Sequence, residues 1–210
     1  MLEQRAGTET TVIVTVTVLP STVPASPSYT NSTDFEQDVL NQTNYYRHKY
    51  NASDLIWNDT LATHARQWAQ PCNWKHSGGP YGENLAEGYA NVTAAVDAWG
   101  DESAKYNFLE PTGFSEQTGH FTQLVWKATT DVGCGVADCP ADNANNEGRR
   151  AVGWFLVCEY WPVGNVEGDD NEYFKENVDR SISQAHGFKE KKGLGACLTL
   201  TLGVILIHLL

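Results

Sequence analysis

The sequence has few basic residues, and this scarcity excludes two classes of partner. Lysine and arginine together number 14 against 26 aspartates and glutamates, which gives a formal net charge of −12. A chain with this balance is repelled by nucleic-acid phosphates and by anionic lipid surfaces. We therefore exclude nucleic acid as a partner, and we expect contact with a membrane only through a C-terminal anchor.

Long apolar runs are also absent. The apolar stretch at residues 196–210 is shorter than the roughly 20 residues that a helix needs to span a bilayer. Residues 10–19 alternate threonine with valine and do not form the continuous apolar core of a secretory signal. We expect the natural N-terminus to lie elsewhere, so that the signal peptide is missing from this sequence.

Cysteine is scarce, with five residues, one of which (Cys197) lies in the apolar C-terminal stretch. The other four allow three pairings, and they are Cys72, Cys134, Cys139 and Cys158. Asn-x-Ser/Thr sequons predict glycosylation and a secretory route, along which thiols form disulfides. The sequons are at Asn31, Asn41, Asn51, Asn58 and Asn91. We expect an extracellular or cell-surface protein, the alternative being an intracellular one whose sequons are accidental.

Composition divides the chain into four parts. Residues 1–33 are rich in Thr, Ser, Val and Pro, which predicts an extended stalk. Residues 34–170 are predicted to be one domain, residues 171–193 a charged linker, and residues 194–210 an apolar tail. A charged spacer before a short apolar tail is typical of a glycolipid (GPI) anchor signal, with Ser183 as the attachment site. The alternative is an uncleaved tail anchor.

Helical patterns come first along the predicted domain and strand-like patterns come later, which favours an α+β fold. A capping box at Thr33 and Glu36 predicts the start of the first helix. The other predicted elements are a helix from Asp59 that ends near Pro71, a helix at 91–106, and strands at 132–136 and 151–160 joined by a polar hairpin loop. Residues 121–126 are apolar and fit either a helix or a strand.

Four motifs along the chain resemble those of one protein family. Residues 119–126 read Gly-His-Phe-Thr-Gln-Leu-Val-Trp, and residues 155–165 resemble a second signature except at Glu159, where a residue such as Asn is usual. Gly-Glu-Asn-Leu at 82–85 and Asn44-x-x-Arg47 are similar to the third and fourth motifs. On these residues the chain is identified as a member of the CAP superfamily (cysteine-rich secretory, antigen-five and pathogenesis-related proteins), near its plant pathogenesis-related branch and fungal relatives.

The resemblance implies a specific architecture. It implies a three-layer α-β-α sandwich with a central antiparallel sheet, in which residues 121–126 are helical. It also implies disulfides between Cys72 and Cys134 and between Cys139 and Cys158.

Motif matching places the polar residues of the family's cleft at His76, Glu83, Glu102 and His120, with Glu116 as a competitor for the place of Glu102. Two imidazoles and two carboxylates can hold a divalent metal, perform acid–base chemistry, or satisfy one another as a polar network. The resemblance implies zinc between His76 and His120, bound weakly because two protein ligands are few. We expect no enzyme activity. A metal-dependent hydrolase or protease is the minor alternative, because no serine has a sequence argument as nucleophile and the His-Glu-x-x-His motif is absent.

The resemblance also implies binding of a sterol, or of a fatty acid, by a monomeric protein. The expected flap over the ligand is the loop 106–114, through Tyr106, Phe108, Pro111 and Phe114. Phe114 falls one residue later than the aromatic of relatives that bind sterols. One alternative for these aromatics is that they are ordinary core residues. An alternative for the whole protein is a surface recognition or virulence module without a small ligand.

Overall fold

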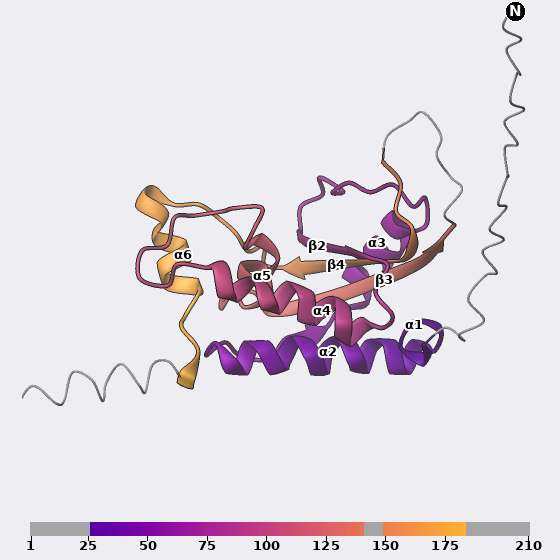
Figure 1. Cartoon of the computed structure of the whole chain (residues 1–210), viewed down its shortest axis with the longest axis horizontal. Helices are drawn as coiled ribbons and strands as arrows, with labels where there is room; N and C mark the ends of the chain where they lie inside the picture. Colours follow the sequence, from indigo (N-terminus) through magenta and orange to yellow (C-terminus); the bar gives the residue numbers. More distant parts are fainter. Residues whose placement is uncertain (1–25, 141–148, 184–210) are drawn as a thin grey trace, which may run out of the picture.

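The computed structural model describes residues 26–140 and 149–183 (Figure 1). Four strands form one mixed sheet in the order β1-β3-β4-β2. Strand β4 (Gly153–Trp161) lies between β3 (Asp131–Cys139) and β2 (Gly82–Glu87) and is antiparallel to both. The short strand β1 (Ile56–Trp57) is parallel to β3. The expectation of a wholly antiparallel sheet is therefore wrong at this edge, where a long connection brings the chain back in the same direction.

The predicted helices are confirmed, with different ends. Residues 121–126 are largely helical, and the predicted helix at 91–106 is an α-helix followed by a 3₁₀ turn. The helices are α1 (Pro27–Thr30), α2 (Ser32–Lys49), α3 (Asp59–Ala69), α4 (Val92–Asp101), α5 (Gly119–Leu124) and α6 (Glu172–Asn177), with 3₁₀ turns η1 (Glu102–Lys105) and η2 (Asp169–Asn171).

Helices cover both faces of the sheet, because alternate residues of each strand point to opposite sides. On one face α3 lies so close that a Cβ at Gly135 would come within 2.2 Å of the backbone nitrogen of Arg66. On the other face, Val132, Leu156 and Tyr160 are fully buried in the core cluster to which α2, α4 and α5 contribute. Figure 1 shows α2 and α4 along one side of the strands. The three-layer α-β-α architecture is confirmed.

A buried arginine on α2 binds the segment between α5 and β3. Arg47 is fully buried, and its guanidinium donates to the carbonyls of Leu124, Trp126 and Thr129 at 2.9–3.2 Å. Burial lowers the pKa of Arg47 to about 10. On the same helix, the Asn44 side chain donates to the carbonyl of Leu55 and accepts from its N–H. The motif Asn44-x-x-Arg47 therefore joins α2 to the segments that follow α5 and precede β1.

The packed unit begins before the predicted boundary at residue 34. Helix α1 lies within the predicted stalk, yet Tyr29 is buried and its ring stacks on Trp154 at 5.0 Å. Ser28 Oγ accepts a hydrogen bond from the N–H of Val92, which joins α1 to α4. The N-cap of α2 is Asn31, whose Oδ1 accepts from two backbone N–H groups, so the predicted capping box is wrong.

The packed unit also extends beyond residue 170, into the predicted linker. Phe174 on α6 is fully buried and meets the ring of Trp126 edge-on at 5.1 Å. Asn177 Oδ1 accepts from the N–H of Ala128, and Lys127 pairs with Asp179. An aromatic anchor and two polar contacts therefore order a segment whose charged composition suggested a linker. The domain boundaries predicted at 34 and 170 are both too narrow.

The two disulfides differ from the expected pairs: they join Cys72 to Cys139 and Cys134 to Cys158. Cys134 and Cys158 face each other in the register of β3 and β4, with their Cα atoms 4.1 Å apart. Cys139 is an odd number of residues beyond Cys134 and therefore points to the opposite face, where Cys72 follows α3.

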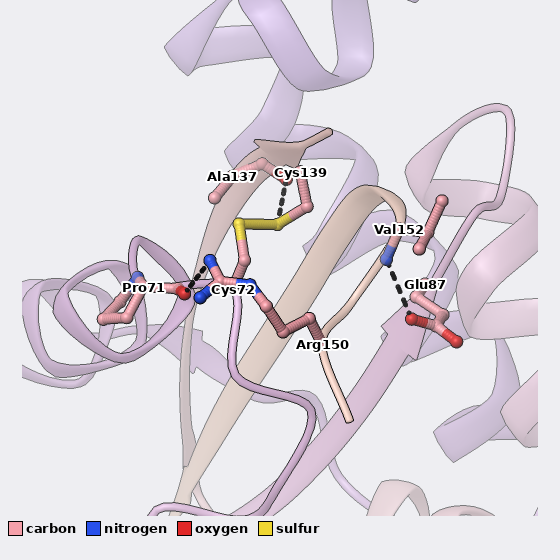
Figure 2. The surroundings of a disulfide bond; sticks show 7 residues. All are labelled: Pro71, Cys72, Glu87, Ala137, Cys139, Arg150 and Val152. Carbon is pink, nitrogen blue, oxygen red and sulfur yellow. Dashed lines mark hydrogen bonds between the residues drawn. A yellow bond between two sulfur atoms is a disulfide. The ribbon is translucent and has the colours of Figure 1, made fainter. Parts of the chain in front are cut away.

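Figure 2 shows the bridge from Cys72 to Cys139 and the contacts around it. Arg150 donates to the carbonyl of Pro71 at 2.8 Å, and the N–H of Val152 donates to Glu87 at 3.1 Å. The bridge therefore joins the segment after α3 to the end of β3, beside the start of β4.

Several predictions fall partly or wholly outside the described residues. These are most of the stalk, most of the hairpin loop at 141–150, and the apolar tail. In the described ranges no helix is long and apolar enough to cross a membrane. Ser183 is described and exposed, and its role as an anchor attachment site stays a prediction.

Candidate functional site

The first histidine–carboxylate pair of the cleft joins a loop to the edge strand β2. His76 Nδ1 is 2.6 Å from Glu83 Oε1, and the N–H of Ser77 donates to the same oxygen at 3.0 Å. The hydrogen bond from His76 to Glu83 raises the pKa of His76. Burial alone would raise the pKa of Glu83, but the hydrogen bonds from His76 and Ser77 outweigh it and lower that pKa.

The second pair joins η1 to the start of α5. His120 Nδ1 is 2.7 Å from Glu102 Oε1. Glu102 Oε2 accepts from the backbone N–H groups of His120 and Phe121 at 3.0 and 3.1 Å. The indole of Trp99 stacks beside the His120 ring at 6.2 Å. Glu102 therefore holds both the backbone and the imidazole of His120. Trp99 and Glu102, three residues apart, both contact this histidine.

A cavity of about 220 Å³ lies between the two histidines. Because both imidazoles bind carboxylates through Nδ1, the tautomer with Nδ1 protonated leaves each Nε2 as the atom available to a ligand. The cavity is lined by His76, Glu83, Asn84, Phe114, Glu116, Gly119, His120 and Asn165. The four predicted cleft residues are thus brought together, although Glu102 lies behind His120 and lines a neighbouring cavity.

Glu116 lines the cavity as an exposed residue, but Glu102 is the residue that binds His120. Three cavity residues were not predicted as site residues, namely Gly119 and two asparagines. Asn84 donates to the carbonyl of His120 at 3.0 Å, and Asn165 donates to the carbonyl of Gly119 at 2.9 Å. Both asparagines lie within the motifs at 82–85 and 155–165, and this position in a motif could have identified them as site residues.

A third histidine–carboxylate pair lies on the α3 face, behind Glu83. Glu159 is fully buried on β4, directly opposite Glu83 in the register of β2 and β4. Glu159 Oε1 is 2.8 Å from His64 Nδ1, and Oε2 is buried without a hydrogen-bond partner of good geometry among the described residues. Burial, and then the charge of Glu83, raises the pKa of Glu159 to about 9. The departure from the family signature at Glu159 was noted from the sequence, but its partner His64 was not.

The site can hold a metal only through few ligands. Within residues 26–140 and 149–183, no group of three or more His, Cys, Asp or Glu is arranged to hold a metal ion. His76 and His120 fit as two imidazole ligands whose orientation is set by Glu83 and Glu102, the arrangement in which a carboxylate supports a ligating histidine. Zinc at this site stays a prediction, and the donor set fits weak binding.

The contacts of Ser77 do not place its hydroxyl against the imidazole of His76 or of His120. Its hydroxyl accepts from the N–H of Gly79 at 3.2 Å, and its own N–H faces Glu83. Covalent catalysis needs a nucleophile within hydrogen-bond reach of its base. Ser77, the residue next to His76 in the sequence, does not meet that condition in this structure.

The predicted lipid-binding loop is half buried and half exposed. Tyr106 is buried, and Phe108 stacks on Tyr50 at 5.9 Å. In contrast, Leu109 and Phe114 have exposed fractions of 71% and 51%. The start of the loop thus packs on the core, as the alternative interpretation expects, while Leu109 and Phe114 present apolar side chains to solvent and Phe114 also lines the cavity.

The late position of Phe114 has a structural cause. Gly113 has a φ of +85°, and a Cβ there would meet Asn171 Oδ1 at 2.5 Å. A larger residue at 113 would be strained by this backbone conformation and would have to displace the Asn171 side chain. Asn171 also donates to the carbonyl of Pro111 at 3.4 Å, so η2 holds the middle of the loop.

The sequon asparagines have structural roles. Asn31, Asn58 and Asn91 are the N-caps of α2, α3 and α4. Asn41 is exposed on α2, and Asn51 is an exposed residue with positive φ that donates to Asp179. None of these contacts tests whether the asparagines carry glycans, which stays a prediction.

A family model described as the cysteine-rich secretory protein family (CAP) matches residues 40–160. The chain belongs to this family. The match includes the strands except Trp161 at the end of β4, the two histidine–carboxylate pairs of the cleft, and the loop between η1 and α5. The CAP membership predicted from the four motifs is confirmed.

Two similar curated proteins come from fungi. Protein PRY2 of Saccharomyces cerevisiae is 45% identical over 151 residues, which cover 69% of this chain and 41% of PRY2. Secreted protein RBT4 of Candida albicans is 40% identical over 177 residues, covering 77% of this chain and 47% of RBT4. This CAP chain therefore spans less than half of the length of either relative. The predicted nearness to the fungal relatives of the plant branch is confirmed.

Solved structures share the fold at low identity. Venom allergen-like protein 4 of Schistosoma mansoni is 22% identical, with a TM-score of 0.51 over 71% of this chain and 97% of that one. A structure titled NaASP2 with Zn²⁺ is also 22% identical, with a TM-score of 0.49 over 70% of this chain and 85% of that one. The first likeness supports the fold, and neither one assigns a ligand to this chain.

Proposed function

We propose that this protein is a secreted CAP protein that binds a sterol, or another small apolar lipid such as a fatty acid, under the loop between η1 and α5. The observation that carries the proposal is the exposure of Phe114, which lines the cavity between the histidines, together with the exposure of Leu109 elsewhere on the same loop. Large apolar side chains on a loop tip cost free energy in water, and an apolar ligand that covers them removes this cost. The loop is therefore suited to close over a lipid.

A second feature favours a lipid that carries a hydroxyl. The aromatic cluster at the base of the loop contains Tyr106, Phe108 and Phe121, with ring centroids 4.9–5.9 Å apart. The hydroxyl of Tyr106 is buried there without a hydrogen-bond partner among the described residues. An unpaired buried hydroxyl costs about 1–3 kcal/mol. A ligand hydroxyl that reached Tyr106 would remove this penalty, which a purely apolar ligand would not do.

Secretion is supported by three independent features. The chain has two disulfides, five sequons, and a similar relative whose name describes it as secreted. Disulfides persist in oxidising compartments and sequons are glycosylated along the secretory route. Attachment through a GPI anchor at Ser183 remains part of the proposal, as does a monomeric state.

Weak zinc binding is the second candidate function of the cleft. His76 and His120 would hold the ion through their Nε2 atoms, and Glu83 and Glu102 would keep the rings in place. Bound zinc would supply a Lewis acid or an additional structural link. The carboxylates of Glu83 and Glu102 would fix the tautomers of the two imidazoles and compensate the positive charge of the bound ion.

The lipid proposal is tested by binding of a radiolabelled sterol to the purified chain. Phe114→Ala removes an exposed cavity residue without opening the core, and Tyr45→Ala, 56% exposed on α2, is the matched control. We expect saturable binding by the wild type and the control, and affinity at least tenfold weaker in Phe114→Ala. If neither sterol nor fatty acid binds saturably, the proposal is wrong and a surface recognition module without a small ligand is favoured.

A further inference from the structure

A row of side chains crosses one end of the sheet on the face covered by α3. Asp131 and Trp161 are partners in the register of β3 and β4. Tyr81 immediately precedes Gly82, which pairs with Tyr160, so Tyr81 lies beside Trp161. Their rings meet edge-on at 6.2 Å. Side chains of directly opposed residues lie on the same face of a sheet, so an acidic residue and two aromatic rings form a continuous row.

Asn58 lies at the end of this row. Its Nδ2 donates to Asp131 Oδ1 at 3.0 Å, and its N–H donates to the carbonyl of Val132 at 2.9 Å. Its Oδ1 caps α3 by accepting from the N–H groups of Thr60 and Leu61 at 3.0 and 3.4 Å. The side-chain amide is thus fixed by three contacts, and it points at the residue next to Trp161.

A cavity of about 410 Å³ lies over the row, separate from the cleft of the two histidines. Its volume falls in the range of about 300–1,000 Å³ that small ligands occupy. Trp161 remains 48% exposed at its edge, which is unusual for a ring of this size beside a cavity. The lining residues are Asn58, Thr60, Leu61, Pro80, Tyr81 and Trp161.

Two of the lining residues, Asn58 and Thr60, are the first and third positions of the sequon Asn58-Asp59-Thr60. The sequence that directs N-glycosylation therefore borders an aromatic cavity in which nothing else of the described chain lies. One face of a pyranose ring presents C–H groups, which pack on the negative face of an aromatic ring. The cavity and the sequon together identify the class of occupant as a sugar attached to this chain.

We propose that Asn58 carries an N-linked glycan whose first sugar lies in this cavity, against the rings of Trp161 and Tyr81. The modification forms a bond from Nδ2 to C1 of the sugar. The lipid-linked pyrophosphate of the donor leaves C1 with the bonding electron pair, and the amide loses one proton. The modified amide keeps one Nδ2 hydrogen that can donate to Asp131, and it keeps Oδ1, the atom that caps α3.

The proposal assigns the glycan a structural effect. A sugar in the cavity covers the exposed indole of Trp161 and packs the start of α3 against the ends of β3 and β4. This inference depends on the secretory part of the proposed function and is independent of lipid binding. Asn58 and Thr60 line this cavity, so we expect glycan loss at Asn58 to lower stability through an aromatic contact.

The experiment uses the full chain, secreted from a eukaryotic host behind a cleavable host leader. Thr60→Ala destroys the sequon and retains the Asn58 cap, because the cap uses the backbone N–H of residue 60. Thr60→Ser keeps the sequon and is the matched control. Both are made in the wild type and in Trp161→Ala, with Tyr81→Leu as a second background should Trp161→Ala fail to fold. Glycopeptide mass spectrometry and thermal unfolding are measured on each protein.

We expect Asn58 to be occupied in the wild type and in Thr60→Ser. Loss of the glycan in Thr60→Ala is expected to lower Tm by about 2–4 °C. In the Trp161→Ala background the same loss should lower Tm by less than half as much, and trimming the wild-type glycan to its first sugar should leave Tm unchanged. An unoccupied Asn58, or an equal fall of Tm with and without Trp161, would overturn the proposal.

Discussion

Replacement of Glu159 by Gln tests whether this buried carboxyl is protonated in the folded protein. Glu159 is fully buried, with His64 from α3 at one oxygen and Glu83 from β2 opposite it. Burial and the charge of Glu83 raise the pKa of Glu159 from 4.5 to about 9. A glutamine has the size of the neutral acid, can donate to Glu83 and can accept from His64. It therefore reproduces the protonated form at every pH.

The sign of the effect follows from the two pKa values. A group whose pKa is higher in the folded state contributes stability below its unfolded pKa and loses it as pH rises toward the folded value. Each pKa unit is worth about 1.4 kcal/mol. Between pH 5 and pH 8 Glu159 is mostly ionised in the unfolded chain but stays protonated in the folded chain, so stability falls as pH rises. Relaxation around a buried pair reduces the full linkage, so we expect the wild type to lose about 2–4 kcal/mol relative to Glu159→Gln over this range.

The assay is urea denaturation of both proteins at pH 5 and at pH 8, with disulfides intact. Glu110→Gln, an exposed substitution in the loop after η1, is the control for a general loss of negative charge. Titration of His76, whose main partner is Glu83, occurs in both proteins and largely cancels in the difference. A stability difference that stays constant, or that grows in favour of the wild type at pH 8, would refute the assignment and indicate a charged His64–Glu159 ion pair instead.

Three further predictions follow from the described contacts. Arg47→Met removes a buried cation that donates to four carbonyls. We expect a loss of about 3–5 kcal/mol in urea denaturation, because the carbonyls of Leu124, Trp126 and Thr129 remain buried without these donors. A loss below 1 kcal/mol would show that water replaces the guanidinium. Non-reducing peptide mapping should find Cys134 linked to Cys158, and the double Ala variant should be about 2–4 kcal/mol less stable; recovery of a peptide linking Cys72 to Cys134 would contradict the structure. Calorimetric titration with zinc should show weak 1:1 binding that is lost in His120→Ala. The binding should weaken as pH falls, because the pKa of His76 is raised and protons compete with zinc for its imidazole. Zinc binding that persists in His120→Ala would place the ion elsewhere.

Local sequence determined the helices, the family motifs and the four cleft residues. Asn58 and Asn91 precede apolar periodic segments and act as N-caps, so the starts of α3 and α4 follow from side chains that bind the next backbone N–H groups. Glu83 and His120 lie within two of the four motifs, and the resemblance to the family placed His76 and Glu102 relative to them. The boundary at residue 34 was wrong for a physical reason, because a stacking contact between Tyr29 and Trp154 has no sequence pattern.

Only the tertiary structure decided which side chains meet across the sheet. Strand register places Cys134 opposite Cys158 and sends Cys139 to the other face, so the disulfide pairs depend on an alternation that sequence separation alone did not resolve. The same register places Glu159 opposite Glu83 and Trp161 beside Asp131. These contacts join residues that are far apart in the sequence, and their free energy depends on burial and on distances between strands. Neither quantity exists in the unfolded chain, and both arise only when the sheet has formed.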